Sequence, residues 1–308
     1  MDKLRVAVIG VGHLGTKHAK VYSQLAERVN LVGVCDIIEE KATAAGREFN
    51  CPAFTDYAGL FGKADAVSIC VPTLLHHKVA KDCLNHGLAV LVEKPFTTTL
   101  KEADGLVSLA ERKNLTLQVG HVERFNSAFQ AICALAKGPR FVECHRLNLF
   151  PNRSLDIGVV LDLMIHDIDI VLGLEGSEIT DIQAVGVKVL TDFEDIANCR
   201  LTFKNGCVCN LTASRISEEV TRKIRIFTKD SYISLDYCKQ EAFIYKKHQG
   251  IISKHHLPIE KEEPLKKEIE SFINCVLFKE KPLVSGNEGR AALDLALRIQ
   301  EKIWKAKK

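Results

Sequence analysis

The chain has 308 residues, 46% hydrophobic and 26% charged, and a formal net charge of +3. This length favours two domains, each large enough to bury a hydrophobic core. The near balance of charge gives no electrostatic reason to expect a nucleic acid partner or an anionic membrane surface. No apolar run approaches the ~18 residues of a membrane-spanning helix, and an apolar strand follows the N-terminus at once. We therefore expect neither a transmembrane segment nor a signal peptide.

The 11 cysteines are scattered and odd in number. Most lie within apolar runs, where cysteine behaves as a small buried hydrophobic residue. Cys207 and Cys209 form a Cys-x-Cys pair, but the second pair that a structural zinc site needs is missing. This pattern predicts a reducing, cytoplasmic location and no metal site.

An apolar strand expected at Arg5–Gly10 runs directly into a G-x-G-x-x-G motif. Gly10 permits a tight turn, Gly12 lets the backbone approach a pyrophosphate, and Gly15 lets the next helix pack closely on the strand. The N-terminus of that helix supplies unpaired N–H groups and a positive dipole end. Asp36 follows the last glycine at about the 20-residue distance expected for an acid that binds ribose hydroxyls. The motif therefore predicts a dinucleotide site.

The residues around Asp36 favour NAD over NADP. Ile37 and Ile38 follow it rather than arginine or serine, so a 2′-phosphate would meet a carboxylate without a cationic partner. His13 and Leu14, between the second and third glycines, complete the loop expected to contact the cofactor. We predict NAD as the cofactor.

Residues 1–121 alternate apolar strands with amphipathic helical stretches. Further strands are expected at Leu31–Asp36, Ala66–Val71, Leu88–Glu93 and Leu115–Val119. This order predicts an NAD-binding domain with a doubly wound parallel (Rossmann) sheet covered on both faces. Ligands of such sheets lie beyond the carboxyl ends of the strands. Additional cofactor contacts are therefore predicted at Pro72, Thr73, His76, Glu93 and Lys94.

Two of these residues leave alternatives open. Lys94, at a strand end in Glu93-Lys94-Pro95, could be partly desolvated, which would lower its pKa and let it hydrogen-bond or deprotonate a hydroxyl. From spacing alone, a surface lysine that closes an ordinary strand is an equally good interpretation. For His76, capping of the following helix competes with contact to a nicotinamide ring.

From about Arg140 the pattern changes. One helix is expected at roughly Val159–Leu172, followed by short strands that include Ile196–Phe203, Cys207–Ser214, Lys223–Thr228 and Tyr232–Asp236, and by helices at Pro264–Phe278 and Gly286–Lys305. This order predicts an α+β domain over residues 122–308, built on one large, mainly antiparallel sheet. A sheet with one open face is expected to associate through it, because a wide apolar surface is rarely left in water. We therefore expect a homo-oligomer.

Asp162 and His166 are four residues apart on the expected helix and hence neighbours on one face. A carboxylate beside an imidazole fixes the tautomer and raises the pKa of the ring, which gives an acid–base pair near neutral pH. A helix-end charge beside a buried histidine is the competing interpretation. Metal binding by His166 with Asp162 or Asp169 is less favoured, because no second histidine is placed to help.

Several residues near the expected domain junction or on the second sheet could bind a substrate. His121, Arg124 and Asn126 follow the fifth strand, and Arg153 and Arg215 lie in the second domain. Arginine grips anions through a forked contact, although most arginines are merely solvated. We predict that these five residues bind the substrate.

Three motifs taken together resemble the Gfo/Idh/MocA oxidoreductases over essentially the whole chain. They are the glycine motif with Asp36, the strand end at Glu93-Lys94-Pro95, and Asp162-x-x-x-His166 in a second α+β domain. The resemblance implies that Lys94 contacts the reacting hydroxyl, His166 exchanges its proton and Asp162 supports the histidine. It also implies a cis lysine–proline bond and a homodimer or homotetramer. Many members carry paired glycines before the aspartate helix, whereas only Gly158 is present here.

Residues 120–126, 153–162 and 210–215 further resemble the subgroup that oxidises C3 of UDP-N-acetylglucosamine. This resemblance implies NAD-dependent oxidation of a sugar hydroxyl, with Arg124, Arg153 and Arg215 as partners of the substrate pyrophosphate. A dehydrogenase of a free sugar, an inositol or another small carbonyl compound is the first alternative. A non-catalytic nicotinamide-binding sensor is the second, although a sensor has no need of the three catalytic residues together.

Overall fold

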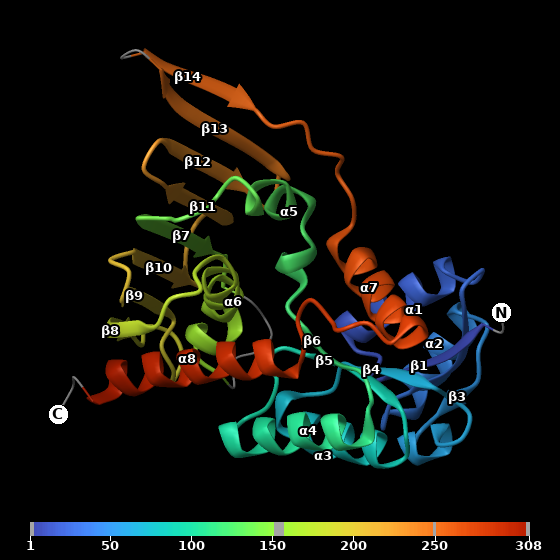
Figure 1. Cartoon of the computed structure of the whole chain (residues 1–308). Helices are drawn as coiled ribbons and strands as arrows, with labels where there is room; N and C mark the ends of the chain where they lie inside the picture. Colours follow the sequence, from blue (N-terminus) through green and yellow to red (C-terminus); the bar gives the residue numbers. More distant parts are fainter. Residues whose placement is uncertain (1–2, 151–156, 249–250, 306–308) are drawn as a thin grey trace. The chain divides into compact units, whose positions relative to one another are not determined.

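The computed structural model describes residues 3–150, 157–248 and 251–305 (Figure 1). The chain forms two compact units, the first made of Met1–Val122 with Glu263–Arg290 and the second of Glu123–Glu262 with Ala291–Lys308. The sequence instead assigns all of residues 122–308 to the second domain. The structure differs because helix α7 (Pro264–Phe278) buries its apolar face, including Ile269 and Phe272, in the core of the first unit.

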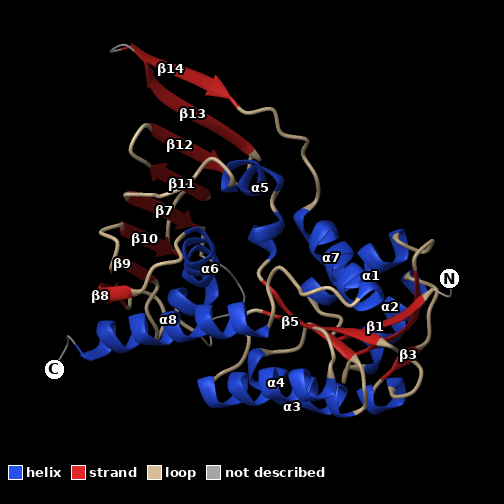
Figure 2. Ribbon diagram, in the orientation of Figure 1, coloured by secondary structure: helices blue, strands red, loops and turns tan. Residues whose placement is uncertain are grey.

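The first unit contains a six-stranded sheet in the order β3-β2-β1-β4-β5-β6, with every pair parallel. Its strands are β1 (Leu4–Ile9), β2 (Val29–Cys35), β3 (Ala53–Phe54), β4 (Ala66–Ile69), β5 (Ala89–Glu93) and β6 (Leu117–Gly120). Its other helices are α1 (His13–Gln24), α2 (Glu39–Glu48), the 3₁₀ turn η1 (Tyr57–Leu60), α3 (Thr73–Asn85) and α4 (Leu100–Lys113). Helices α3 and α4 cover one face, and α1, α2 and α7 cover the other (Figure 2). The predicted doubly wound parallel sheet is confirmed.

The second unit is built on an eight-stranded sheet in the order β14-β13-β12-β11-β7-β10-β9-β8. Its strands are β7 (Phe141–Leu147), β8 (Ile179–Val187), β9 (Ile196–Phe203), β10 (Val208–Ser214), β11 (Thr221–Phe227), β12 (Ser231–Asp236), β13 (Glu241–His248) and β14 (Ile251–His256). Only β7 and β10 pair in parallel among the strand pairs of this sheet that the structure describes. The predicted mainly antiparallel sheet is therefore confirmed.

Helices cover one face of this second sheet. They are α5 (Ser127–Cys133), the π-helical turn η3 (Val160–Met164), α6 (Ile165–Leu174) and α8 (Gly286–Lys305), whose residues 286–290 belong to the first unit. The 3₁₀ turn η2 (Val122–Phe125) precedes α5 on the chain. Side chains of β7 and β10 alternate between fully buried and half-buried positions. Such alternation is typical of a sheet with one face packed on the core and the other open.

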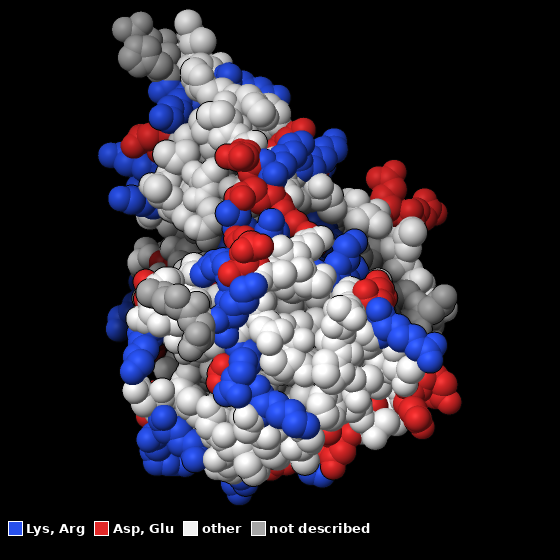
Figure 3. Space-filling model, turned by 90° about the vertical axis from the view of Figure 1, so that its right-hand side faces the viewer, with Lys and Arg blue, Asp and Glu red and all other residues white. Residues whose placement is uncertain are grey.

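The surface carries charges of both signs. On the face drawn in Figure 3, lysine and arginine side chains lie among aspartate and glutamate side chains, as the near balance of charge in the sequence suggests. Among the described residues, no helix combines the length and the apolar character that crossing a membrane requires.

Candidate active site

The glycine loop joins β1 to α1, and each glycine meets a different constraint. Gly10 has a φ of +86°, and a Cβ there would lie 2.8 Å from the Cys70 carbonyl carbon. A Cβ on Gly15 would lie 1.7 Å from the Gly10 oxygen, so only glycine allows α1 to approach the loop this closely. A Cβ on Gly12 would meet no protein atom within 4 Å. The space beside Gly12 therefore fits an approaching ligand.

The start of α1 suits an anion. Gly12 precedes the helix and brings no side chain to cap its first N–H groups. His13 is exposed and Leu14 half-buried at this first turn. Helix N-termini of this kind bind phosphate through the N–H groups and the helix dipole. The residues present thus fit the pyrophosphate of a dinucleotide.

Asp36 lies directly after β2 and contacts the glycine loop. Its Oδ2 accepts a hydrogen bond from the Val11 N–H at 3.0 Å, and its Oδ1 accepts one from the Ile38 N–H at 3.0 Å. Each carboxylate oxygen keeps acceptor capacity for a ribose hydroxyl. Ile37, 83% exposed, offers no charge to a 2′-phosphate.

His76 links the ends of two neighbouring strands. Its Nε2 lies 2.9 Å from the Val71 carbonyl oxygen, and its Nδ1 lies 2.8 Å from the Pro95 carbonyl oxygen. Burial lowers the pKa of His76, although the two carbonyl contacts oppose this shift. Because both ring nitrogens face backbone carbonyls, the structure favours a bracing role over the nicotinamide contact that the sequence offered. Pro72 caps α3, and Thr73 is its first residue.

Glu93 is the last residue of β5 and Lys94 follows it, and the Lys94–Pro95 bond is cis, as the family resemblance implies. Glu93 is only 7% exposed, and its Oε1 lies 3.0 Å from Nε2 of His18 on α1. Its Oε2 accepts a hydrogen bond from the Lys94 N–H at 3.3 Å. Sequence reasoning missed His18 as a functional candidate, although it follows the last glycine by three residues.

In the second unit, Asp162 lies in the π-helical turn η3 and His166 in the first turn of α6. The sequence predicted a regular helix here. Single π-helical turns within helices are frequent at functional sites. The three residues that the family resemblance makes catalytic come from both units. Lys94 belongs to the first unit, and Asp162 and His166 belong to the second.

Gly158 precedes this helical segment and packs against a buried carboxylate. A Cβ there would lie 1.9 Å from Oε1 of Glu194, so the side chain of Glu194 occupies the space that a larger residue would need. Glu194 is fully buried, and its Oε1 accepts hydrogen bonds from the Val160 N–H at 3.4 Å and from Nε2 of Gln300 at 3.0 Å. This carboxylate thus caps the start of the helical segment.

Helix α6 is held in place by two arginines. Arg146 on β7 makes a forked contact with Asp167, with N–O distances of 3.0 and 2.9 Å. Arg146 also donates to Glu123 at 2.9 Å, and Nε of Arg124 lies 3.3 Å from Asp169. Burial raises the pKa of Asp167, an effect that Arg146 opposes. Because Asp167 and Asp169 follow His166 in α6, these pairs hold the helix that carries it.

Two residues predicted to bind substrate have structural partners instead. Arg215 is 0% exposed and donates to Asp195 at 2.8 Å, to the Ile157 carbonyl at 2.9 Å and to the Thr191 hydroxyl at 2.9 Å. Its guanidinium thus has several partners within its own unit, and substrate binding by Arg215 stays a prediction. Asn126 is buried as well, and its Oδ1 accepts the Ala128 N–H at the start of α5.

The remaining predicted substrate residues differ in their surroundings. Arg124 pairs with Asp169, and a Cβ on Gly173 would lie 1.5 Å from its Nη1, so the guanidinium packs directly against α6. His121 is buried at the end of β6. Arg153 lies outside the described residues.

Comparison with known proteins decides the family. Residues 4–121 match the model of the oxidoreductase family with an NAD-binding Rossmann fold, and residues 135–234 match the GFO/IDH/MocA C-terminal domain. The chain belongs to the Gfo/Idh/MocA family. It is thus an NAD-dependent dehydrogenase, as predicted.

Several individual proteins are similar to this chain. It is 39% identical to UDP-N-acetylglucosamine 3-dehydrogenase of Acidithiobacillus ferrooxidans, over 97% of both chains. The solved structure of that enzyme superposes with a TM-score of 0.93, covering 98% of both chains. Myo-inositol 2-dehydrogenase of Thermotoga maritima is 25% identical over 97% of this chain and 96% of its own. A levoglucosan dehydrogenase solved with NADH and levoglucosan shares the fold at 19% identity, with a TM-score of 0.89 over 99% of this chain and 98% of its own.

Proposed function

We propose that this dehydrogenase oxidises the C3 hydroxyl of UDP-N-acetylglucosamine or of a closely related nucleotide sugar. The observation that carries the proposal is the 39% identity with the UDP-N-acetylglucosamine 3-dehydrogenase, which extends over both domains and not over the nucleotide-binding domain alone. The residues that resemble this subgroup include Gly120–Asn126 and Asn210–Arg215.

The proposed reaction divides the work between the two compact units. Lys94 hydrogen-bonds the reacting hydroxyl, and His166 takes the hydroxyl proton as the carbonyl forms, supported by Asp162. The chemistry that bound NAD would supply is acceptance of the hydride from the carbinol carbon. The open space beside Gly12 and the carboxylate of Asp36 would hold its pyrophosphate and a ribose. The chain thus supplies position and proton transfer.

The substrate pyrophosphate needs a cationic partner. Arg215 is enclosed by Asp195 and Thr191, and Arg124 is paired with Asp169. We therefore propose Arg153 as the main partner of the substrate pyrophosphate. We propose that His121 contacts the sugar. Replacement of Arg153 by alanine would then raise KM for UDP-sugars more than it lowers kcat.

Formation of NADH by the purified enzyme tests the substrate. The wild-type protein is incubated with NAD and, separately, with UDP-N-acetylglucosamine, free N-acetylglucosamine and myo-inositol. We expect turnover with the UDP-sugar and a loss of about 10²–10⁴-fold in kcat for Lys94→Ala and for His166→Ala. Turnover of myo-inositol in place of the UDP-sugar would establish the alternative dehydrogenase. Binding of NADH without turnover of any of the three would favour the sensor.

We further propose that the protein works in the cytoplasm as a homodimer or homotetramer formed through the open face of the eight-stranded sheet. A row of aromatic rings crosses this face. It consists of half-buried Phe141, Phe227, Tyr232 and Tyr245, with successive centroids 5.7, 4.6 and 4.8 Å apart. Sedimentation velocity should show an oligomer that Tyr232→Glu dissociates. A monomeric wild-type protein would rule this assembly out.

A further inference from the structure

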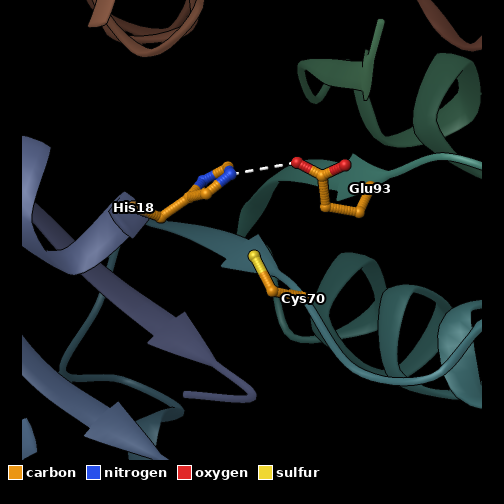
Figure 4. Close-up of side chains that lie close together, drawn as sticks. All are labelled: His18, Cys70 and Glu93. Carbon is orange, nitrogen blue, oxygen red and sulfur yellow. Dashed lines mark hydrogen bonds and ion pairs between the residues drawn. The ribbon is translucent and has the colours of Figure 1, made fainter. Parts of the chain in front are cut away.

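A cluster of two buried polar side chains and a half-buried cysteine in the first unit lies outside the proposed reaction. His18 comes from α1, Cys70 follows β4, and Glu93 ends β5 (Figure 4). His18 is 0% exposed. Buried ionisable groups are costly unless they are paired, so this arrangement needs a physical reason.

The Glu93 carboxylate is fixed from three directions. Its Oε1 accepts a hydrogen bond from Nε2 of His18 at 3.0 Å, because an ionised carboxylate only accepts. Its Oε2 accepts the backbone N–H of Lys94 at 3.3 Å. On the third side the carboxylate lies against the backbone of Gly120, where a Cβ would be 2.9 Å away. Glu93 is thereby linked to α1, to the end of β6 and to the backbone of Lys94.

We infer that His18 is a positioning residue for Lys94, acting through Glu93. The inference rests on the proposed role of Lys94 at the reacting hydroxyl. Helix α1 begins at the glycine loop, so the pair connects the helix of the cofactor cradle to the strand end that carries the lysine. Beyond Lys94 on the chain, the Pro95 carbonyl lies against Nδ1 of His76, so the segment after β5 is held on both sides of the lysine. A displacement of even 1 Å in such a residue can cost ~10²-fold in rate.

Metal binding is the competing explanation of the cluster. One ligand atom each from His18, Cys70 and Glu93 lie within 4.8 Å of one another, and zinc accepts such a ligand set. The hydrogen bond between His18 and Glu93 joins Nε2 directly to Oε1, with no ion between them, and leaves the buried Nδ1 of His18 without a hydrogen-bond partner among the described residues. Burial, helped by the carboxylates of Glu93 and Glu268, raises the pKa of the Cys70 thiol well above its ordinary value. Zinc would have to displace the thiol proton to bind here, so the metal content of the purified protein decides between the two explanations.

The test compares three variants on α1 in the full-length protein. His18→Leu removes the donor to Glu93, while His18→Gln keeps an N–H that can reach the carboxylate. Tyr22→Phe is the matched control, because it removes another buried hydrogen bond of α1, the 2.8 Å contact with Ser68, and leaves Glu93 untouched. His18→Asn, too short to reach Glu93, replaces His18→Leu should that variant not fold.

Three measurements are made on each variant: NAD affinity by calorimetry, kcat and KM with UDP-N-acetylglucosamine, and amide hydrogen exchange of the peptide around Lys94 in the NAD-bound protein. We expect His18→Leu to lower kcat by about 10–10²-fold, with NAD affinity and KM unchanged and faster exchange at Lys94. His18→Gln should recover most of kcat and of the slow exchange. Tyr22→Phe should keep wild-type kcat and exchange at Lys94.

Specific results would overturn the inference. One is a His18→Leu variant with wild-type kcat and exchange, and another is a Tyr22→Phe variant with the same losses as His18→Leu. Stoichiometric zinc in the purified protein, released by His18→Leu, would establish the metal site instead. If the wild-type protein oxidises no UDP-sugar, the proposed function fails, while hydrogen exchange still decides whether His18 holds the Lys94 backbone.

Discussion

The glycine loop of the first unit and the arginines of the second unit were both identified as binding residues from residue type and position. The contacts that they make in the structure agree with the prediction for the glycines but not for the arginines. Gly10 and Gly15 make the close backbone contacts that their spacing predicts. Arg124 and Arg215, predicted to grip a substrate anion, instead pair with carboxylates of their own unit. A spacing motif encodes local backbone geometry, whereas the partner of a single long side chain depends on distant parts of the chain.

Substitution of the glycines should give the largest effects. Gly15→Ala would place a Cβ 1.7 Å from the Gly10 oxygen and should destabilise the protein by more than the ~1–3 kcal/mol of ordinary overpacking. Gly12→Ala, where the added atom meets nothing within 4 Å, should retain the wild-type free energy of unfolding and lose NAD affinity. Urea unfolding and calorimetric titration with NAD measure both. If Gly12→Ala and Gly15→Ala lowered the free energy of unfolding equally, the separation of a packing role for Gly15 from a ligand-binding role for Gly12 would be wrong.

Removal of the buried arginine comes next in size. Arg215→Ala leaves the carboxylate of Asp195 buried without its arginine partner, and such a change costs about 3–5 kcal/mol. Three backbone N–H donors, from Val189, Leu190 and Thr191, also hold this carboxylate and lower its pKa against the effect of burial. Unfolding in urea measures the loss.

The exposed pair of Lys204 with Glu178 provides the control for Arg215. Lys204→Ala should change stability by less than about 1 kcal/mol. A rise in KM for UDP-sugars in Arg215→Ala, without loss of stability, would restore the substrate role that the sequence suggested.

The smallest effect concerns the pH dependence of stability. Burial lowers the pKa of His76 in the folded protein, whereas the unfolded chain titrates near pH ~6.5. As the pH falls below about 6.5, the unfolded state therefore takes up a proton that the folded state refuses, and the free energy of unfolding decreases. His76→Gln should flatten this decrease between about pH 7.5 and about pH 5.5. An unchanged slope would mean that His76 is not held neutral by its surroundings.

Most of the fold was predictable because its elements carry strong periodic patterns. The bounds of α7, α8 and β9 agree with the sequence prediction. Strand β3 is too short, at two residues, to produce a recognisable pattern. The π-helical turn at Val160–Met164 also escaped prediction, because it differs from an α-helix in hydrogen bonding rather than in the order of apolar residues.

The candidate site was predictable in part. Asp36, Lys94 and the glycines follow from their places at strand ends, whereas Arg146 and Glu194 gave no signal, since their partners lie far away in the sequence. His18 carried a weak signal from its distance to Gly15. The assignments of Asp162 and His166 to proton transfer stay predictions.

The sequence alone determined the family, the cofactor type and the two sheet architectures, because glycine spacing and apolar periodicity are local properties of the chain. Only the tertiary structure decided that α7 completes the first unit, that the side chain of Glu194 packs against Gly158, and which charges are neutralised inside the protein. Those outcomes depend on burial, which removes water as a partner and obliges each polar group to find another within the fold.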